Sequence, residues 1–259
     1  MAKGASISGF PEWLPSERVV EQRVIDTLRN VFELNGFIGI ETRAVEQGSS
    51  LLKKGETSKE IYLLSRLQEV GHESDTPIED RLGLHFDLTV PLSRYVVEHS
   101  GDLAFPFKRW QIQKVWRGER PQEGRFREFV QADIDVIGNG DLPDHYEVEL
   151  PLVMVSALER LREFGLPKAT VHANNRKLSE GFYRGLGLTD IEGVLREIDK
   201  LDKIGADKVR ALLTDTCGVT AEQADEILRF IACPGTSADK LAFLEQYCGR
   251  NETFDTGLD

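Results

Sequence analysis

The amino-acid sequence predicts an α+β fold, in which an antiparallel sheet is flanked by helices and followed by a mainly helical segment. Two strand-like runs, residues 105–117 and 126–138, enclose a connection with turn composition. Long stretches with helical apolar spacing lie before and after this pair. From about residue 176 one short helical pattern follows another. We therefore expect two domains, residues 1–175 and 176–259.

The first predicted element is a helix from Pro15 to Gly36. Its apolar residues recur three or four positions apart, and Gly36 stands where a C-terminal cap is expected. These apolar residues are Val20, Val24, Leu28, Val31 and Phe32. The following stretch FIGIE, residues 37–41, predicts a strand entering the core.

A half-buried strand is predicted around residues 84–90, because apolar and polar residues alternate there. Leu84, Phe86, Leu88 and Val90 alternate with His85, Asp87 and Thr89. Pro91 suits the first turn of a following helix, which Gly101 would end. Asp87 and Thr89 would then project from one polar face near the end of the strand.

Three further segments complete the expected order. Apolar residues at helical spacing predict a helix over about residues 146–164, and KATVHANN (168–175) predicts a strand. Beyond it, SEGFYRGLG, IEGVLREIDKLDKIG and AEQADEILRFIA predict successive helices with short breaks.

Composition excludes several classes of protein. The net charge of -12 and the pI near 5.0 argue against a protein that coats nucleic acid without sequence preference. No apolar run approaches the roughly 20 residues that cross a bilayer, so we expect no membrane partner. The N-terminus lacks the apolar core of a signal peptide, which predicts a cytoplasmic protein. The three cysteines are far apart and the histidines lack ligand spacing, so we expect no metal site.

The hairpin around residues 105–138 has an unusual distribution of charge. Val130, Ala132, Ile134 and Val136 share one face of its second strand, while Gln131, Asp133 and Asp135 share the other. Four arginines, at positions 117, 120, 125 and 127, gather at the bend. Arginine suits phosphate oxygens, and carboxylates and amides suit an ammonium or imidazole group. The pattern therefore fits a polyphosphate beside a small cationic molecule, but from spacing alone a solvated, salt-bridged hairpin is the favoured interpretation.

The stretch RGERPQEGRFREFVQADIDVIG, residues 117–138, resembles motif 2 of class II aminoacyl-tRNA synthetases in the form carried by histidyl-tRNA synthetases. The helix and strand after Pro15 are similar to motif 1, the dimer-interface element of that class. LHFDLTVPLSRYV resembles the histidine-binding strand, and VHANNRKLSEGFYRGLG with IDKLDKIG resembles the stretch leading into the family's insertion domain. The resemblance covers nearly the whole chain, in order.

The resemblance implies a role for individual residues. Arg117 would grip the α-phosphate of ATP and the histidine carboxylate, and Glu119 would contact the adenine amino group. Arg125 would hold the γ-phosphate, and Phe129 would stack on adenine. The amino group and ring of histidine would be held by Asp87, Thr89, Gln131 and Asp135. Asp133 shares their face, and His85 lies beside Asp87, but the resemblance fixes no role for either.

The implied reaction is attack of the histidine carboxylate on the α-phosphorus of ATP, which releases pyrophosphate and leaves histidyl-adenylate. The histidyl group would then pass to tRNA(His). Mg²⁺ would neutralise the polyphosphate. The implied partners are L-histidine, ATP, tRNA(His) and a second copy of the chain in a homodimer.

The chain departs from the family pattern in its second half. A stretch like R-G-L-D-Y-Y-T, the glycine-rich motif 3 and an anticodon-binding domain are all missing from these 259 residues. We expect an N-terminal portion of a synthetase that is weakly active or inactive in isolation. The alternative is a non-catalytic, histidine-sensing paralogue, such as a regulatory subunit of ATP phosphoribosyltransferase.

Overall fold

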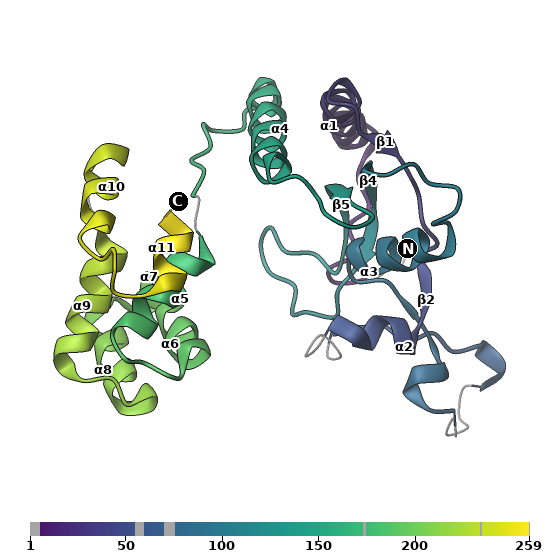
Figure 1. Ribbon diagram of the computed structural model, residues 1–259. Coiled ribbons are helices and arrows are strands. Elements are labelled where there is room, and N and C mark those ends of the chain that lie inside the picture. The colour runs from purple at the N-terminus through teal and green to yellow at the C-terminus, as the bar shows by residue number, and fades with distance from the viewer. Residues whose placement is uncertain (1–5, 55–59, 70–75, 173–174, 234, 259) are drawn as a thin grey trace. The chain divides into compact units, whose positions relative to one another are not determined.

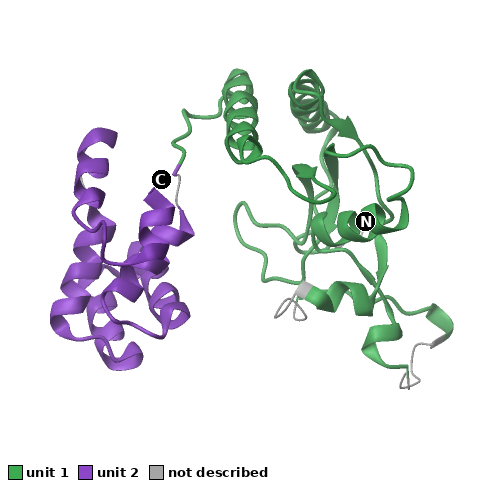
Figure 2. Cartoon of the chain, viewed as in Figure 1, with its two compact units in different colours: residues 1–171 green, residues 172–259 purple. Residues whose placement is uncertain are grey.

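The computed structural model describes residues 6–54, 60–69, 76–172, 175–233 and 235–258. The chain forms two compact units, residues 1–171 and 172–259 (Figure 1, Figure 2). The first unit holds both sheets, and the second is helical. The boundary between the units precedes residue 176, where the sequence predicted the second domain to start.

The predicted hairpin is the centre of the first unit and is confirmed. Strand β4 (Phe107–Trp116) pairs antiparallel with β5 (Glu128–Ile137), so that Gln111 faces Asp133 and Gln113 faces Gln131. The short strand β1 (Ile38–Gly39) pairs with β4 in parallel, which gives the sheet order β1-β4-β5. Every second residue of β4 and β5 therefore belongs to the same face of this sheet.

Two helices cover the even-numbered face of the hairpin. They are α1 (Pro15–Leu34), which ends before Gly36 at a φ of 80°, and α4 (His145–Leu161), which continues into a 3₁₀ turn, Arg162–Phe164. Figure 1 shows α1 and α4 running beside each other above the sheet. The apolar side chains between helices and sheet are Leu28, Val31, Phe32, Phe37, Trp110, Ile112, Ile134, Val136, Leu150, Val153 and Ala157. The opposite, odd-numbered face of β4 and β5 carries polar side chains in its middle, at Arg109–Gln113 and Gln131–Asp135, and apolar ones toward the strand ends.

The strand predicted over residues 84–90 is wrong in its extent. Strand β3 (Leu82–Leu84) pairs antiparallel with β2 (Val45–Gln47) and stops at Leu84, and α3 (Thr89–Glu98) begins before Pro91. His85, Phe86, Asp87 and Leu88 are all buried, so the alternation of residue types does not reflect alternating exposure. The short helix α2 (Gly48–Leu51) and the 3₁₀ turns Leu52–Lys54, Leu67–Glu69 and Ile78–Asp80 complete this region.

The strand predicted over residues 168–175 is also wrong over its described part. Residues 168–172 and 175 have irregular backbone, and residues 173–174 lie outside the described residues. A strand needs a partner for its backbone groups, and no described strand pairs with this segment. Asn175 instead caps the next helix, because its side chain accepts a hydrogen bond from the backbone N–H of Lys177.

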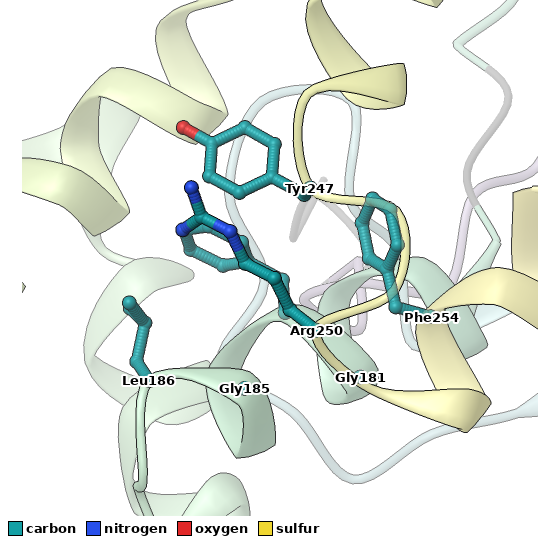
Figure 3. Close-up of a pocket in the computed structure, with 7 residues that line it drawn as sticks. Gly181, Gly185, Leu186, Tyr247, Arg250 and Phe254 are labelled. Carbon is teal, nitrogen blue, oxygen red and sulfur yellow. The ribbon is translucent and has the colours of Figure 1, made fainter.

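Helices make up the second unit, as the sequence predicted. They are α5 (Arg176–Gly185), α6 (Ile191–Ile198), α7 (Leu201–Ile204), α8 (Ala206–Cys217), α9 (Ala221–Ala232), α10 (Ser237–Glu245) and α11 (Glu252–Leu258). Phe182 stacks on Phe230, and Tyr247 meets both rings edge-on. Figure 3 shows how closely Gly181 of α5 lies to Phe254 of α11 in this aromatic core.

Candidate functional site

The odd-numbered face of the hairpin carries a row of polar side chains over three successive cross-strand pairs. Cross-strand pairing places Arg109 opposite Asp135, Gln111 opposite Asp133 and Gln113 opposite Gln131. Arg117 follows on the same face beyond the apolar pair Val115 and Phe129, and its backbone N–H continues the ladder by donating to the carbonyl of Arg127 at 2.8 Å. Alternation in β5 had predicted one polar face, and the structure confirms it.

Arg117 binds two separate segments of this face with one side chain. Its Nε donates to the backbone carbonyl of Phe86 at 3.1 Å, and its Nη2 donates to Oε1 of Gln131 at 3.1 Å. The guanidinium carbon also lies 5.1 Å from the centre of the Phe129 ring. Arg117, Phe129 and Gln131, which the resemblance assigned to one site, are therefore in contact.

Gln131 also forms hydrogen bonds with Asp133. Because its Oε1 accepts from Arg117, its Nε2 faces Asp133 and donates to Oδ1 at 3.1 Å and Oδ2 at 2.9 Å. Asp133 is thus an acceptor that fixes the orientation of the Gln131 amide.

Asp135 is held by a buried cation, Arg109. Nη2 of Arg109 lies 2.5 Å from Oδ2 of Asp135 and 4.0 Å from Oδ2 of Asp133. Burial raises the pKa of the Asp135 carboxyl, Asp133 adds to the rise, and Arg109 opposes it. Burial likewise lowers the pKa of the Arg109 guanidinium, against the attraction of Asp135, Asp133 and Asp87.

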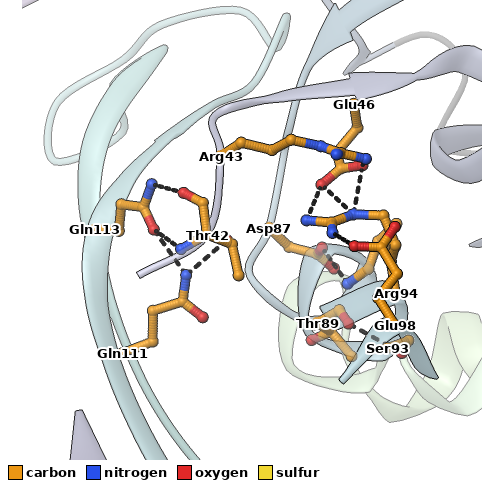
Figure 4. Close-up of polar contacts among 11 residues, drawn as sticks. Thr42, Arg43, Glu46, Asp87, Thr89, Ser93, Arg94, Glu98, Gln111 and Gln113 are labelled. Carbon is orange, nitrogen blue, oxygen red and sulfur yellow. Dashed lines mark hydrogen bonds and ion pairs between the residues drawn. The ribbon is translucent and has the colours of Figure 1, made fainter. Parts of the chain in front are cut away.

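Asp87 and Thr89 approach the same region from the start of α3 rather than from a strand (Figure 4). Asp87 is buried, and its Oδ1 accepts a hydrogen bond from the backbone N–H of Val90 at 3.2 Å, within the first turn of the helix. Thr89 is the first helical residue and is exposed. The link from Arg117 to the carbonyl of Phe86 ties this segment to the hairpin.

His85 has a structural partner in the hairpin. Its Nε2 lies 2.7 Å from the carbonyl of Lys114, so this nitrogen carries the proton and donates it. Its buried Nδ1 is then an acceptor, and it has no hydrogen-bond partner among the described residues. The ring also packs against Trp116, at 5.5 Å between ring centres. His85 therefore packs against β4 and has a structural role there.

A cluster of amides lines the middle of the face. Gln111 Nε2 donates to Thr42 Oγ1 at 2.9 Å and to Gln113 Oε1 at 2.7 Å, and Gln113 Nε2 donates to the carbonyl of Thr42 at 2.7 Å (Figure 4). The same view shows Arg94 of α3 paired with the buried Glu46, at 2.9 Å between Nη2 and Oε1. The amide bonds anchor the loop before β2 to the hairpin, and the Arg94–Glu46 pair ties α3 to β2.

The two charged residues expected at the bend pair with each other. Nε of Arg125 lies 2.6 Å from Oε2 of Glu119, and Arg127 Nε donates to the backbone carbonyl of Glu119 at 3.1 Å. Arg125 is exposed, so this pair is worth at most about 1 kcal/mol and separates easily.

Arg109 is the site residue that sequence reasoning missed. It occupies an odd position of β4, in step with Gln111, Gln113 and Arg117, and this alternation was the available signal. Among the described residues, no group of three or more His, Cys, Asp or Glu side chains is placed to hold a metal ion. Within the same residues, no helix is both long and apolar enough to cross a membrane.

Comparison with known proteins identifies the family. The family model described as "Histidyl-tRNA synthetase" matches residues 9–255. A histidine–tRNA ligase from Bifidobacterium longum subsp. infantis is 87% identical over 242 residues, which cover 93% of this chain and 52% of the relative. One from Bifidobacterium animalis subsp. lactis is 83% identical, over 100% of this chain and 55% of the relative.

A solved structure agrees in fold. The crystal structure of histidyl-tRNA synthetase from Nostoc sp. PCC 7120 matches with a TM-score of 0.84 and 34% identity, covering 100% of this chain and 56% of that one. The α+β fold class is thereby confirmed. The chain spans about half the length of the curated relatives it matches. Because the family model matches all but its extreme ends, the chain belongs to the histidyl-tRNA synthetase family.

Proposed function

We propose that the chain forms the N-terminal part of a histidine–tRNA ligase, which activates histidine with ATP and transfers it to tRNA(His). The observation that carries this proposal is the connected row Arg117–Gln131–Asp133 beside Asp135, on the odd-numbered face of the hairpin. It joins a cationic end, suited to phosphate, to an acidic end, suited to a cationic amino acid. Residues 1–175 would belong to the catalytic core, and residues 176–259 to the insertion domain.

The cationic end would bind ATP. Arg117 would hold the α-phosphate with the planar fork that suits oxyanions, and Arg125 would hold the γ-phosphate. Glu119 would accept from the adenine amino group, and Phe129 would stack on the ring. The pair between Glu119 and Arg125 would have to open, which its exposed position makes inexpensive.

The acidic end would bind histidine. The carboxylates of Asp87, Asp133 and Asp135 outnumber the guanidinium groups of Arg109 and Arg117, which favours a ligand with a positive charge. Gln131, Asp87 and Thr89 would hold the amino group, and Asp135 would accept a hydrogen bond from the imidazole ring. Histidine offers both groups.

Catalysis by these residues would be positioning and charge stabilisation. Arg117 would bind the histidine carboxylate and the α-phosphate together, so that the attacking oxygen and the phosphorus meet. The same guanidinium would stabilise the charge that develops on the α-phosphate oxygens. Mg²⁺, carried by the ATP phosphates, would neutralise the departing pyrophosphate.

Three further assignments belong to the same proposal. The enzyme would act in the cytoplasm, as a homodimer whose interface includes α1 and β1. On α1 and just before it, Leu14, Val19 and Val20 are exposed apolar residues that such an interface would cover. The isolated 259 residues would form adenylate weakly or not at all, because the family's second arginine and motif 3 are not among them.

ATP–pyrophosphate exchange by the full-length protein tests the activity. We expect exchange that depends on histidine and is lost in Arg117→Ala. Histidine binding without exchange, together with unchanged nucleotide affinity in Arg117→Ala, would instead favour the alternative, a histidine-sensing regulatory paralogue. Single-turnover adenylation by the 259-residue chain alone tests the last assignment, which robust product formation would refute.

A further inference from the structure

Arg109 is a fully buried cation in the middle of the proposed amino-acid site. Its side chain has 0% exposure, whereas that of its partner Asp135 has 37%. Its Nη1 lies 3.5 Å from the backbone carbonyl of Asp133, whereas its buried Nε and Nη2 have no hydrogen-bond partner among the described residues, so Nη2 contacts Asp135 as an ion pair. Nothing in the family resemblance assigns a role to this residue.

Fold stability does not account for this arrangement. A buried ion pair costs desolvation of both charges, and well-packed apolar residues commonly replace one without loss of stability. The geometry is also one-sided. Arg109 is fully buried, whereas part of the Asp135 side chain is exposed, and this exposed part is left for another donor. A cation so placed fixes the carboxylate without competing for its open side.

We propose that Arg109 is a positioning residue of the amino-acid site, whose guanidinium holds the Asp135 carboxylate in the orientation that accepts an imidazole N–H. This inference rests on the proposed function, because it assumes that histidine is the ligand. It adds that the specificity of the ring pocket depends on a side chain that does not touch the ligand. Asp133, 4.0 Å from the same guanidinium, would be kept apart from Asp135 by the same cation.

Loss of Arg109 should therefore weaken the binding of histidine and leave the binding of ATP unchanged. Asp133 and Asp135 lie two residues apart on one face of β5, and without the cation their carboxylates repel each other. Asp135 would then turn away from its ligand-accepting orientation. A lost orienting contact should raise the KM for histidine about tenfold or more, with kcat within about threefold of wild type. The KM for ATP should not change, because the ATP residues lie at the other end of the hairpin.

The experiment compares Arg109→Met with Lys108→Met in the full-length protein, by ATP–pyrophosphate exchange with histidine and ATP varied separately. Lys108 is the matched control, because it is the neighbouring residue of β4 and also loses an ion pair, with Glu149, but it belongs to the opposite face. A melting curve of each variant measures the structural cost. Should Arg109→Met fail to fold, Arg109→Lys is measured instead, since it keeps the charge but shortens the fork.

A rise in the KM for histidine that is specific to Arg109, with the KM for ATP unchanged, supports the inference. An unchanged KM for histidine in a folded Arg109 variant overturns it, as does an equal rise in Lys108→Met. Absence of histidine-dependent exchange in the wild type is a different result, because it overturns the proposed function itself.

Discussion

Arg117 and Gln131 are joined by one hydrogen bond, from Nη2 to Oε1 at 3.1 Å, and this bond decides which way the Gln131 amide points. With its oxygen toward Arg117, the amide presents its NH₂ group to Asp133. The two ends of the proposed site, for ATP and for histidine, are therefore coupled through a single side chain. A substitution at this position should affect both.

Gln131→Met should weaken the binding of both histidine and ATP. Methionine has a similar length, but it can neither accept a hydrogen bond from Arg117 nor donate one to Asp133. Each lost contact leaves a half-buried partner, at a cost of about 1–3 kcal/mol. We expect kcat/KM for histidine to fall about 10- to 100-fold in ATP–pyrophosphate exchange, with a smaller fall for ATP. Lys114→Met is the control, since Lys114 is exposed on the opposite face and pairs with Glu128 there. A variant with wild-type kinetics would show that the Gln131 amide is not part of the site.

Arg117→Lys should be nearly as damaging as Arg117→Ala. Lysine keeps the charge, but a single ammonium cannot replace the fork that now reaches Phe86 and Gln131 together. By analogy with loss of one oxyanion donor, we expect kcat to fall about 10²- to 10³-fold, measured by exchange at saturating substrates. Arg162→Lys, in an exposed pair with Glu159, should leave the rate unchanged. A fall smaller than about tenfold would mean that charge alone suffices at this position.

The hairpin could be predicted from sequence, and so could the set of side chains on each of its faces, because both depend on a local pattern. Alternation over ten residues of β5 fixes which side chains share a face, whatever surrounds them. The polar row from Gln131 to Asp135 followed directly from it. Arg117 was predicted through the resemblance of its neighbourhood to motif 2, and its contacts agree with a place in that row.

Residues 84–90 show where local pattern fails. Their alternation predicted a strand, but His85, Phe86 and Asp87 are all buried, whichever residue type they are. Asp87 caps a turn of helix instead of lying on a strand face. The hydrogen bond of Asp87 is local, but the burial depends on contacts with residues about 30 positions away, such as the bond from His85 to Lys114. The ion pair of Arg109 with Asp135 was missed for the same reason, since only the strand register brings the two together.

Val20→Asp tests the proposed dimer. Val20 is 48% exposed on α1, the helix assigned to the interface, and a carboxylate buried there without a partner would be costly. A penalty of about 3 kcal/mol raises the dissociation constant more than 100-fold, so we expect monomers at micromolar concentration in sedimentation experiments. Leu241→Asp, at an exposed apolar position of α10, should leave the dimer intact. A wild-type protein that is already monomeric would contradict the assignment.

Tyr183 should make the helical unit sensitive to alkaline pH. Burial raises the pKa of its hydroxyl to about 12, and Asp199 adds to the rise. The folded state therefore keeps the proton that the unfolded state releases above about pH 10, so this contribution to stability is full below pH 10 and is lost as the pH rises toward 12. Between pH 9 and pH 11 the unfolding free energy should fall by about 1 kcal/mol more in wild type than in Tyr183→Phe, measured with urea and far-UV circular dichroism. Equal losses of unfolding free energy in the two proteins would refute the raised pKa of Tyr183.

Gly181→Ala should destabilise the helical unit without affecting the first unit. A Cβ at Gly181 of α5 would lie 2.2 Å from the backbone nitrogen of Phe254 and 2.5 Å from its Cα, and backbone of α11 cannot move aside as a flexible side chain could (Figure 3). The two helices would have to separate around their aromatic core. Such overpacking costs about 1–3 kcal/mol, which exceeds the gain of about 1 kcal/mol in helix propensity from glycine to alanine.

The chain offers a matched control variant for Gly181→Ala, and tryptophan fluorescence and circular dichroism serve as two probes of its unfolding. At Gly185, the last residue of the same helix, a Cβ would meet only ordinary contacts at 3.7 Å or more, so Gly185→Ala should be neutral or slightly stabilising. All three tryptophans, Trp13, Trp110 and Trp116, belong to the first unit, whereas far-UV circular dichroism is dominated by helices. In urea, Gly181→Ala should lower the dichroism midpoint and leave the tryptophan fluorescence midpoint unchanged. If both midpoints fell together, the two units would unfold as one, and the close approach of α5 and α11 would stabilise the whole chain.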